Sequence, residues 1–286
     1  MLDTSNPGLR IKTVQKLREG FELKEDLVAT EEPLEIVLVY NKNNKPVYKT
    51  ISITMRTPGD DENLVRGFLF TEGILLHPTK EINGFEYRFS CQGDVVEQQT
   101  ILVHLKPEAY PNIDQLDRHF YTNSSCGVCG KTSIDLVLDN CSFLLKKESP
   151  LVTNKTLFSL MDTLTKDQRL FQLTGGIHAC GLFDTDGNLL DKAEDVGRHN
   201  ALDKLIGKAL MNEFIPLDDK IILLSGRASF EMIHKACMAG TAVVAAVGAP
   251  SSLAVETAEA MGMSLIGFLK AGSANIYCGA QRIHIL

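Results

Sequence analysis

The chain has 286 residues, a formal net charge of −7 and a hydrophobic fraction of 44%. Its mean hydropathy is −0.01 and its sequence pI is about 5.5. These values are typical of one or two globular domains, and they exclude a disordered chain, a collagen and a coiled coil. Because the chain is acidic, we expect no general nucleic-acid-binding surface, and an anionic ligand would need a local basic pocket.

The location of the protein can be predicted from its apolar segments and its cysteines. The most apolar stretch, 236–247, is too short to span a membrane and contains Gly240. The first twenty residues lack the apolar core of a secretion signal. Seven cysteines, an odd number without such a signal, indicate reduced thiols. We therefore expect a cytoplasmic protein with neither membrane nor nucleic acid as a partner.

Residues 1–120 are expected to form a small α+β roll. Two β-rich runs flank a turn-rich linker, which is typical of a hairpin, and a segment with an acidic start and a closing glycine follows as a helix. The expected elements are strands at 35–40 and 49–55, a helix at 60–73, and strands at 85–89 and 100–105. This ββαββ order predicts one sheet with one helix.

Residues 121–286 are expected to form a second domain of the α/β class. Three of its strands lack apolar/polar alternation, which indicates burial on both faces in a largely parallel sheet. The expected elements are helices near 157–164, 202–209, 230–240 and 253–261, a hairpin of 177–183 with 188–193, and buried strands at 220–224, 242–247 and 264–269. Strands that alternate with helices in this way predict a three-layer α/β/α sandwich.

A Cys-x-x-Cys motif, Cys126 and Cys129, lies in the segment 121–131, which is rich in small and glycine residues. We interpret this segment as a mobile loop between the domains. Two thiols at this spacing can share a metal ion, form a disulfide or pass sulfur between them. A zinc ribbon would need a second such pair or a histidine pair, and a thioredoxin-like site would need the start of a helix in a βαβ unit. A thiol on a glycine-flanked loop suits a carrier that visits two sites. The motif alone does not decide between a metal site, a redox disulfide and a sulfur carrier.

Three strand-to-helix segments of the second domain could bind an anion. They are 193–201, which contains Arg198 and His199, then 225–229, which contains Arg227, and 248–252. Helix N-termini offer unpaired N–H groups, and glycines allow close backbone approach. Each segment alone could be a plain helix cap, but ligands of open α/β sheets bind where such loops meet. Three loops in one domain therefore favour a nucleotide-like ligand.

His178 lies in the glycine-rich run 175–180. The run is distantly similar to the zinc deaminase signature, in which H-x-E is followed by P-C-x-x-C. Here Cys180 replaces the glutamate, and the Cys-x-x-Cys motif precedes the histidine. We therefore expect neither zinc nor deamination, and we expect the remaining histidines to be structural or exposed.

Six ordered motifs together resemble the formate dehydrogenase accessory sulfurtransferase family (FdhD/NarQ), and the resemblance covers nearly the whole chain. The motifs are 125–130, 175–180, 194–204, 225–229, 248–252 and 267–272. Members of this family accept sulfane sulfur from a cysteine desulfurase and deliver it to the molybdenum bis-molybdopterin guanine dinucleotide cofactor for formate dehydrogenase. The resemblance also implies a second domain similar to cytidine deaminase and the absence of a catalytic metal. It is compatible with a homodimer.

By position in the family motifs, Cys126 would hold the persulfide, with Cys129 as either a resolving thiol or a second carrier. The cofactor would contact Phe268, Leu269, Lys270, Ala271, Gly272 and Ser273, with Arg198, His199 and Arg227 nearby. Ser273 stands where relatives often have arginine, so Lys270 or another loop would supply that charge. Two alternatives remain: a chaperone that only binds the cofactor and tolerates loss of Cys126, and a zinc-binding module.

Overall fold

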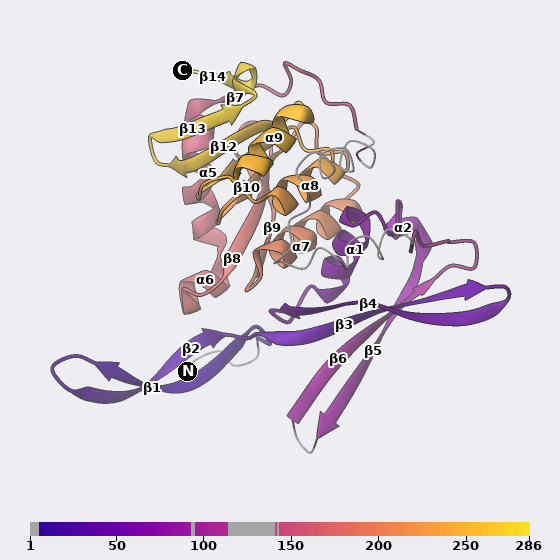
Figure 1. Ribbon diagram of the computed structural model, residues 1–286. Helices are drawn as coiled ribbons and strands as arrows, with labels where there is room; N and C mark the ends of the chain where they lie inside the picture. The colour runs from indigo at the N-terminus through magenta and orange to yellow at the C-terminus, as the bar shows by residue number, and fades with distance from the viewer. Residues whose placement is uncertain (1–5, 93–94, 114–140, 142) are drawn as a thin grey trace.

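The computed structural model describes residues 6–92, 95–113, 141 and 143–286. Figure 1 shows a small half built on one sheet, a larger layered half, and a hairpin arm that projects away from both. The expected mobile loop at 121–131, with Cys126 and Cys129, lies outside the described residues.

The arm is a two-stranded antiparallel hairpin of β1 (Leu9–Leu17) and β2 (Phe21–Ala29). One of its faces carries exposed apolar side chains such as Leu17 and Phe21, and the other carries charged ones. The sequence analysis did not predict these strands.

The small half contains the expected ββαββ order in one four-stranded sheet. Its strands are β3 (Glu32–Lys42), β4 (Lys45–Arg56), β5 (Ile82–Gln92) and β6 (Val95–Leu105), in the order β4-β3-β6-β5. Asn43 and Asn44 turn the first hairpin, both with left-handed φ, which asparagine tolerates well. Helix α1 (Asp61–Thr71) packs its buried apolar side chains on this sheet, and the short α2 (Pro78–Glu81) follows it.

The larger half is built on a six-stranded sheet with the order β13-β12-β11-β10-β8-β9. The strands are β8 (His178–Phe183), β9 (Leu189–Asp195), β10 (Ile221–Leu224), β11 (Val243–Ala246), β12 (Ser264–Lys270) and β13 (Ser273–Cys278). The three buried strands β10, β11 and β12 run parallel to one another, as their sequences predicted. The sheet as a whole is mixed, because β8, β9 and β13 pair antiparallel.

Helices cover both faces of this sheet and produce three layers (Figure 1). On one face lie α7 (Arg198–Met211), α8 (Phe230–Met238) and α9 (Ser252–Ala260). On the other lies α5 (Asn154–Asp167), which buries Leu157, Leu160 and Leu164 against the sheet. The remaining elements are α6 (Arg169–Thr174), the 3-10 turn η2 (Ala280–Arg282) and the short strand pair β7 (Val152–Thr153) and β14 (Ile283–His284).

The two halves meet where α1 crosses α7 at very short range. A Cβ atom on Gly67 of α1 would lie 1.9 Å from the carbonyl oxygen of Asp203, and one on Gly207 of α7 would lie 1.9 Å from that of Asn63. Real side chains cannot approach backbone this closely. Glycine at both positions is therefore what allows this crossing.

Buried ion pairs reinforce this junction. Lys204 Nζ lies 2.7 Å from Asp195 Oδ2 and donates a hydrogen bond to the carbonyl oxygen of Thr57 in the small half. Lys235 Nζ bridges Asp203 at 3.0 Å and Glu72 at 2.7 Å. Because buried charges are costly unless they are paired, these contacts hold the two halves in one fixed arrangement.

The structure corrects one expectation about the cysteines. Cys141 and Cys237 form a disulfide with their Cα atoms 6.3 Å apart, so the expectation of isolated, reduced thiols is wrong for this pair. The two residues are 96 positions apart, and only tertiary packing brings them together. Cys180 is free and buried, and that burial raises the pKa of its thiol, which leaves it unreactive.

In the described part of the chain, no helix is both long enough and apolar enough to cross a membrane.

Candidate functional site

Three helices of the larger half begin at one edge of its sheet. The strands β9, β10 and β11 point in the same direction, so the loops that follow them meet at their carboxyl ends. The helices α7, α8 and α9 start there with Gly197, Ser229 and Ser251 as their N-cap residues. The sequence analysis expected these three loops to gather at this edge, and that expectation is confirmed.

Hydrogen bonds join two of the loops and the end of β12 into one continuous surface. The N–H of Gly248 donates to the carbonyl of Gly226 at 2.9 Å, and the N–H of Phe268 donates to the carbonyl of Gly248 at 3.2 Å. We call this surface, made of 225–229, 248–251 and Phe268, the carboxyl-edge shelf. A Cβ on Gly248 would lie 3.0 Å from the Cα of Arg227, so glycine permits this contact between the loops.

The shelf presents backbone donors that the fold leaves unused. The N–H groups of Gly226 and Arg227 donate to no residue that the structure describes. The first turn of α7 adds further N–H groups that have no partner within the helix. Such donors next to helix N-termini are suited to bind phosphate oxygens.

The cations expected at this edge behave in different ways. Arg227 is exposed on the shelf, whereas Arg198 and His199 are partly buried at the start of α7. The Nε atom of Arg198 and the Nε2 atom of His199 are buried, and neither has a hydrogen-bond partner in the described structure. Burial, together with the nearby Arg198 and Lys235, lowers the pKa of His199 to about 4. His199 is therefore neutral at pH 7 and adds a hydrogen-bonding group, not a positive charge.

The stretch 268–273 forms the end of β12 and the turn into β13. Phe268 is 49% exposed and has a left-handed φ of 52°, a strained conformation for a non-glycine residue that is often found at functional sites. Its ring is available to a ligand beside the shelf. Leu269 instead points into the core under α5, so only its backbone could contact a ligand. The remaining residues of the stretch are exposed: Lys270, Ala271, Gly272 and Ser273.

The expected site residues are thus spread along one edge and not gathered in one pocket. Phe268 lies near the end of β12, Arg227 follows β10, and Arg198 follows β9, at the far side of the sheet. Four strand spacings separate β12 from β9, which is a span of about 19 Å. An extended ligand such as a dinucleotide can cover this distance, whereas a single phosphate cannot.

The structure places one further residue at this edge that the sequence analysis left unassigned. His178 begins β8, and its ring packs against Gly226 on the shelf. A histidine between paired glycines and a strand was the only signal for it in the sequence.

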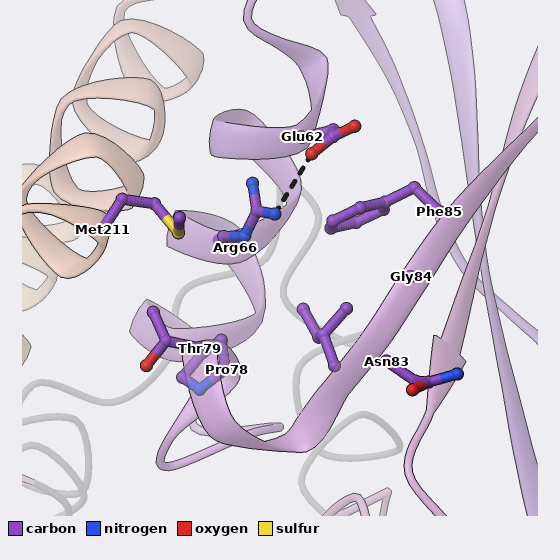
Figure 2. A pocket seen from close by; sticks show the side chains of 9 residues that line it. Glu62, Arg66, Pro78, Thr79, Asn83, Gly84, Phe85 and Met211 are labelled. Carbon is purple, nitrogen blue, oxygen red and sulfur yellow. Dashed lines mark hydrogen bonds and ion pairs between the residues drawn. The ribbon is translucent and has the colours of Figure 1, made fainter.

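A separate cavity of about 300 Å³ lies between α1, the start of β5 and the end of α7 (Figure 2). Arg66 donates to Glu62 at 3.1 Å, and its guanidinium lies 4.6 Å from the centre of the Phe85 ring. Met211, at the opposite end of α7 from the shelf, closes one side. None of the site residues expected from the sequence lines this cavity.

Metal-binding groups do not gather in the described ranges, where no cluster of three or more His, Cys, Asp or Glu side chains could hold an ion. Cys126 and Cys129 lie outside those ranges, so the roles expected for them stay predictions.

Comparison with known proteins places these features in context. The sequence profile of the FdhD/NarQ family matches residues 29–284. Proteins named "Sulfur carrier protein FdhD" are similar to this chain: the one from Streptomyces coelicolor is 44% identical over 95% of this chain and 94% of its own length, and the one from Mycobacterium tuberculosis is 44% identical over 90% and 92%. The one from Picrophilus torridus is 41% identical over 90% of this chain and 92% of its own length.

A solved structure shares the fold. The crystal structure of a proposed formate dehydrogenase accessory protein from Desulfotalea psychrophila superimposes with a TM-score of 0.71 over 97% of this chain and 100% of that one. Its sequence is 22% identical, so this likeness concerns the fold alone.

Proposed function

The chain belongs to the FdhD/NarQ family, and from that premise we propose that it is a sulfur carrier that moves sulfane sulfur from a cysteine desulfurase to the molybdenum bis-molybdopterin guanine dinucleotide cofactor of a formate dehydrogenase. The observation that carries the cofactor part of this proposal is the carboxyl-edge shelf. There the matching motifs supply unused N–H groups, an exposed aromatic ring and cations along one line.

Loading of sulfur follows from thiol chemistry. The thiolate of Cys126 attacks the terminal sulfur of the desulfurase persulfide, a new S–S bond forms on Cys126, and the desulfurase cysteine leaves as a thiolate. The transferred sulfur is already zero-valent, so this step needs no redox cofactor.

Release of sulfur needs two electrons, because the cofactor takes up sulfide. Cys129 can supply them when its thiolate attacks the inner sulfur of the Cys126 persulfide. That attack forms a Cys126–Cys129 disulfide and frees hydrosulfide, so atoms and electrons balance. Alternatively, Cys129 shares the cargo as a second persulfide, and the electrons come from a thiol of the receiving system.

The cargo cofactor is an extended anion with two pyrophosphate groups, and the shelf offers what such a substrate needs. The N–H groups of Gly226 and Arg227 and the side chain of Arg227 would meet phosphate oxygens. Phe268 would lie against a planar ring system, and Lys270 beyond it would supply the positive charge that Ser273 lacks. Arg198 would bind at the far end of the same edge.

In this proposal the protein is a sulfurtransferase that works in the cytoplasm, where desulfurase, cofactor and unfinished dehydrogenase are all present. A second copy of the chain is a further expected partner. The cytidine-deaminase-like arrangement of the larger half also stays a proposal, supported by its three layers and by the position of His178 at the start of β8.

The proposal is tested by activation of a formate dehydrogenase that lacks sulfurated cofactor, with desulfurase, cysteine and the purified carrier. Cys126→Ala should abolish activation while it leaves binding of GDP unchanged. If Cys126→Ala activates at the wild-type level, the protein is the cofactor-binding chaperone and not a sulfur carrier.

The variant Arg227→Ala tests cofactor binding separately from the loading of sulfur on Cys126. A charge-assisted contact to phosphate typically contributes about 1.5–3 kcal/mol, so the variant should bind GDP roughly ten-fold or more weakly. It should still form the persulfide on Cys126. Lys45→Ala, in the β3–β4 hairpin of the small half, is the matched control and should change neither property.

A further inference from the structure

His178 is a site residue that the family motifs did not assign. It begins β8, opposite Asp195 of β9, and so lies between the shelf and the start of α7. A Cβ on Gly226 would lie 3.4 Å from both the Cε1 and the Nδ1 atom of its ring, so the imidazole packs directly on the shelf.

The ring of His178 has no hydrogen-bond partner among the described residues. Neither nitrogen of His178 makes a hydrogen bond with any residue that the structure describes, and the side chain is only partly buried. Asp195, the residue opposite His178 on β9, is already occupied. One of its oxygens lies 2.7 Å from Lys204 Nζ, and the other accepts the N–H of Gly197 at 2.8 Å. The imidazole is therefore free to bind a ligand.

The surroundings of the ring favour its neutral form in the free protein. The charged side chains of the surrounding elements are Arg198 of α7, Asp195 of β9, Arg227 of the neighbouring loop, and Glu194 of β9, whose carboxylate accepts N–H groups of α6. Partial burial and Arg198 lower the pKa of His178, and Asp195 opposes them only in part. An anion placed on the shelf would reverse this balance, because an opposite charge nearby favours the protonated form.

We propose that His178 contacts the cargo, and that its imidazole takes up one proton from solvent as it hydrogen-bonds a pyrophosphate oxygen of the bound guanine dinucleotide. The proposal rests on the proposed function, since it assumes that the dinucleotide lies on the shelf. The proton joins the free ring nitrogen, and no other bond forms or breaks. His199 does not fit this role, because its Nε2 atom is buried and because burial, Arg198 and Lys235 lower its pKa.

The consequence is a cargo affinity that depends on pH. The carboxyl edge has permanent positive charge in Arg198 of α7 and Arg227 of the shelf, and protonated His178 adds to it only while an anion is bound. Binding is therefore tighter at lower pH, and loss of the proton weakens the contact when the cofactor is handed on.

The test is calorimetric titration of the full chain with GDP-mannose between pH 6 and 8, in two buffers that differ in ionisation enthalpy. GDP-mannose is a guanosine pyrophosphate diester, as in the cargo, so its phosphates do not titrate in this range. The wild-type protein should take up a measurable fraction of a proton per ligand, and its affinity should fall about three-fold or more from pH 6 to pH 8.

The variant His178→Gln keeps a neutral hydrogen-bonding side chain. At pH 8 it should bind GDP-mannose within about two-fold of the wild-type protein, which also shows that it is folded, but it should lose the proton uptake and the pH dependence. His284→Gln, exposed on β14 and away from the shelf, is the matched control and should behave as the wild-type protein does.

The outcomes are distinct. If His178→Gln keeps the same proton uptake, or if His199→Gln removes it instead, the inference about His178 is wrong, while the shelf remains the binding site. If the wild-type protein does not bind GDP-mannose at any pH in this range, the cofactor part of the proposed function fails as well.

Discussion

At the scale of single residues, we expect replacement of Lys204, the buried lysine of α7, to destabilise the junction strongly. Lys204 is 2% exposed and pairs with Asp195, whose side chain is fully buried. Lys204→Met would leave this carboxylate without its cation. Because an unpaired buried charge is costly, the variant should lower the free energy of unfolding by about 3–5 kcal/mol, as measured by urea denaturation.

Lys208, one turn further along α7, is the matched control. Its side chain is 21% exposed and pairs with Asp60 at 3.1 Å. Lys208→Met should cost about 1 kcal/mol or less, because partly exposed pairs are screened by solvent. Equal losses for the two variants would show that the buried pair has no special part in the junction.

His199 predicts a dependence of stability on pH. Its pKa is about 4 in the folded protein and near 6.5 in the unfolded chain. As pH falls through this window, the unfolded chain binds the proton first, so the stability contribution present above pH 6.5 is lost toward pH 4. The loss should be on the order of 2 kcal/mol.

His199→Gln removes this titration, so its free energy of unfolding should fall less steeply than that of the wild-type protein between pH 6.5 and 4. Asp203, whose pKa is raised to about 6 by burial, gives a slope of opposite sign, but it is present in both chains and cancels in the comparison. Parallel curves for the two proteins would contradict the assignment to His199.

The chemistry of individual residues could be predicted from the sequence only where it is local. Arg198 and Arg227 follow strands directly, so their place at the carboxyl edge was predictable. The neutral state of His199 was not, because it depends on burial and on Lys235 of another helix. The inward side chain of Leu269 and the Cys141–Cys237 bond were likewise hidden, since both depend on packing between distant segments.

At the scale of elements, the crossing of α1 and α7 reverses the usual effect of glycine in a helix. In an unconstrained helix, glycine to alanine stabilises by up to about 1 kcal/mol. Here Gly67→Ala would place a Cβ 1.9 Å from backbone, so the helices must move apart. We expect a loss of about 1–3 kcal/mol or more, measured by urea denaturation.

Gly20→Ala provides the contrast, because a Cβ at this position in the hairpin arm meets nothing within 4 Å. It should change the free energy of unfolding by less than about 0.5 kcal/mol. A stabilised Gly67→Ala protein would show that the crossing is looser than the structure has it.

Elements with a strong and uniform hydrophobic pattern could be predicted from the sequence, and elements with a mixed pattern could not. The buried strands β10, β11 and β12 are continuous apolar runs, and their order with the helices between them led to the carboxyl edge. The arm strands β1 and β2 do alternate apolar with charged residues, but most of their side chains are exposed and charged residues are frequent, so this pattern was overlooked beside the apolar strands of the core. β13 is largely exposed and was missed for the same reason.

At the scale of the whole molecule, the two halves should unfold together. Buried hydrogen bonds cross the junction: Lys204 donates to the Thr57 carbonyl, Asn200 to that of Met55, and Lys235 to the hydroxyl of Thr71. Calorimetry should therefore give one transition, with equal calorimetric and van't Hoff enthalpies. Two separate transitions would contradict a rigid junction between the halves.

The central claim is that Cys126 carries sulfur, and intact-mass spectrometry tests it most directly. The protein is incubated with a cysteine desulfurase and cysteine, and its mass is measured before and after treatment with a reductant. We expect an adduct of about 32 Da that maps to Cys126, disappears with reductant and is absent from Cys126→Ala. No adduct on the wild-type protein, or an equal adduct on Cys126→Ala, would contradict it.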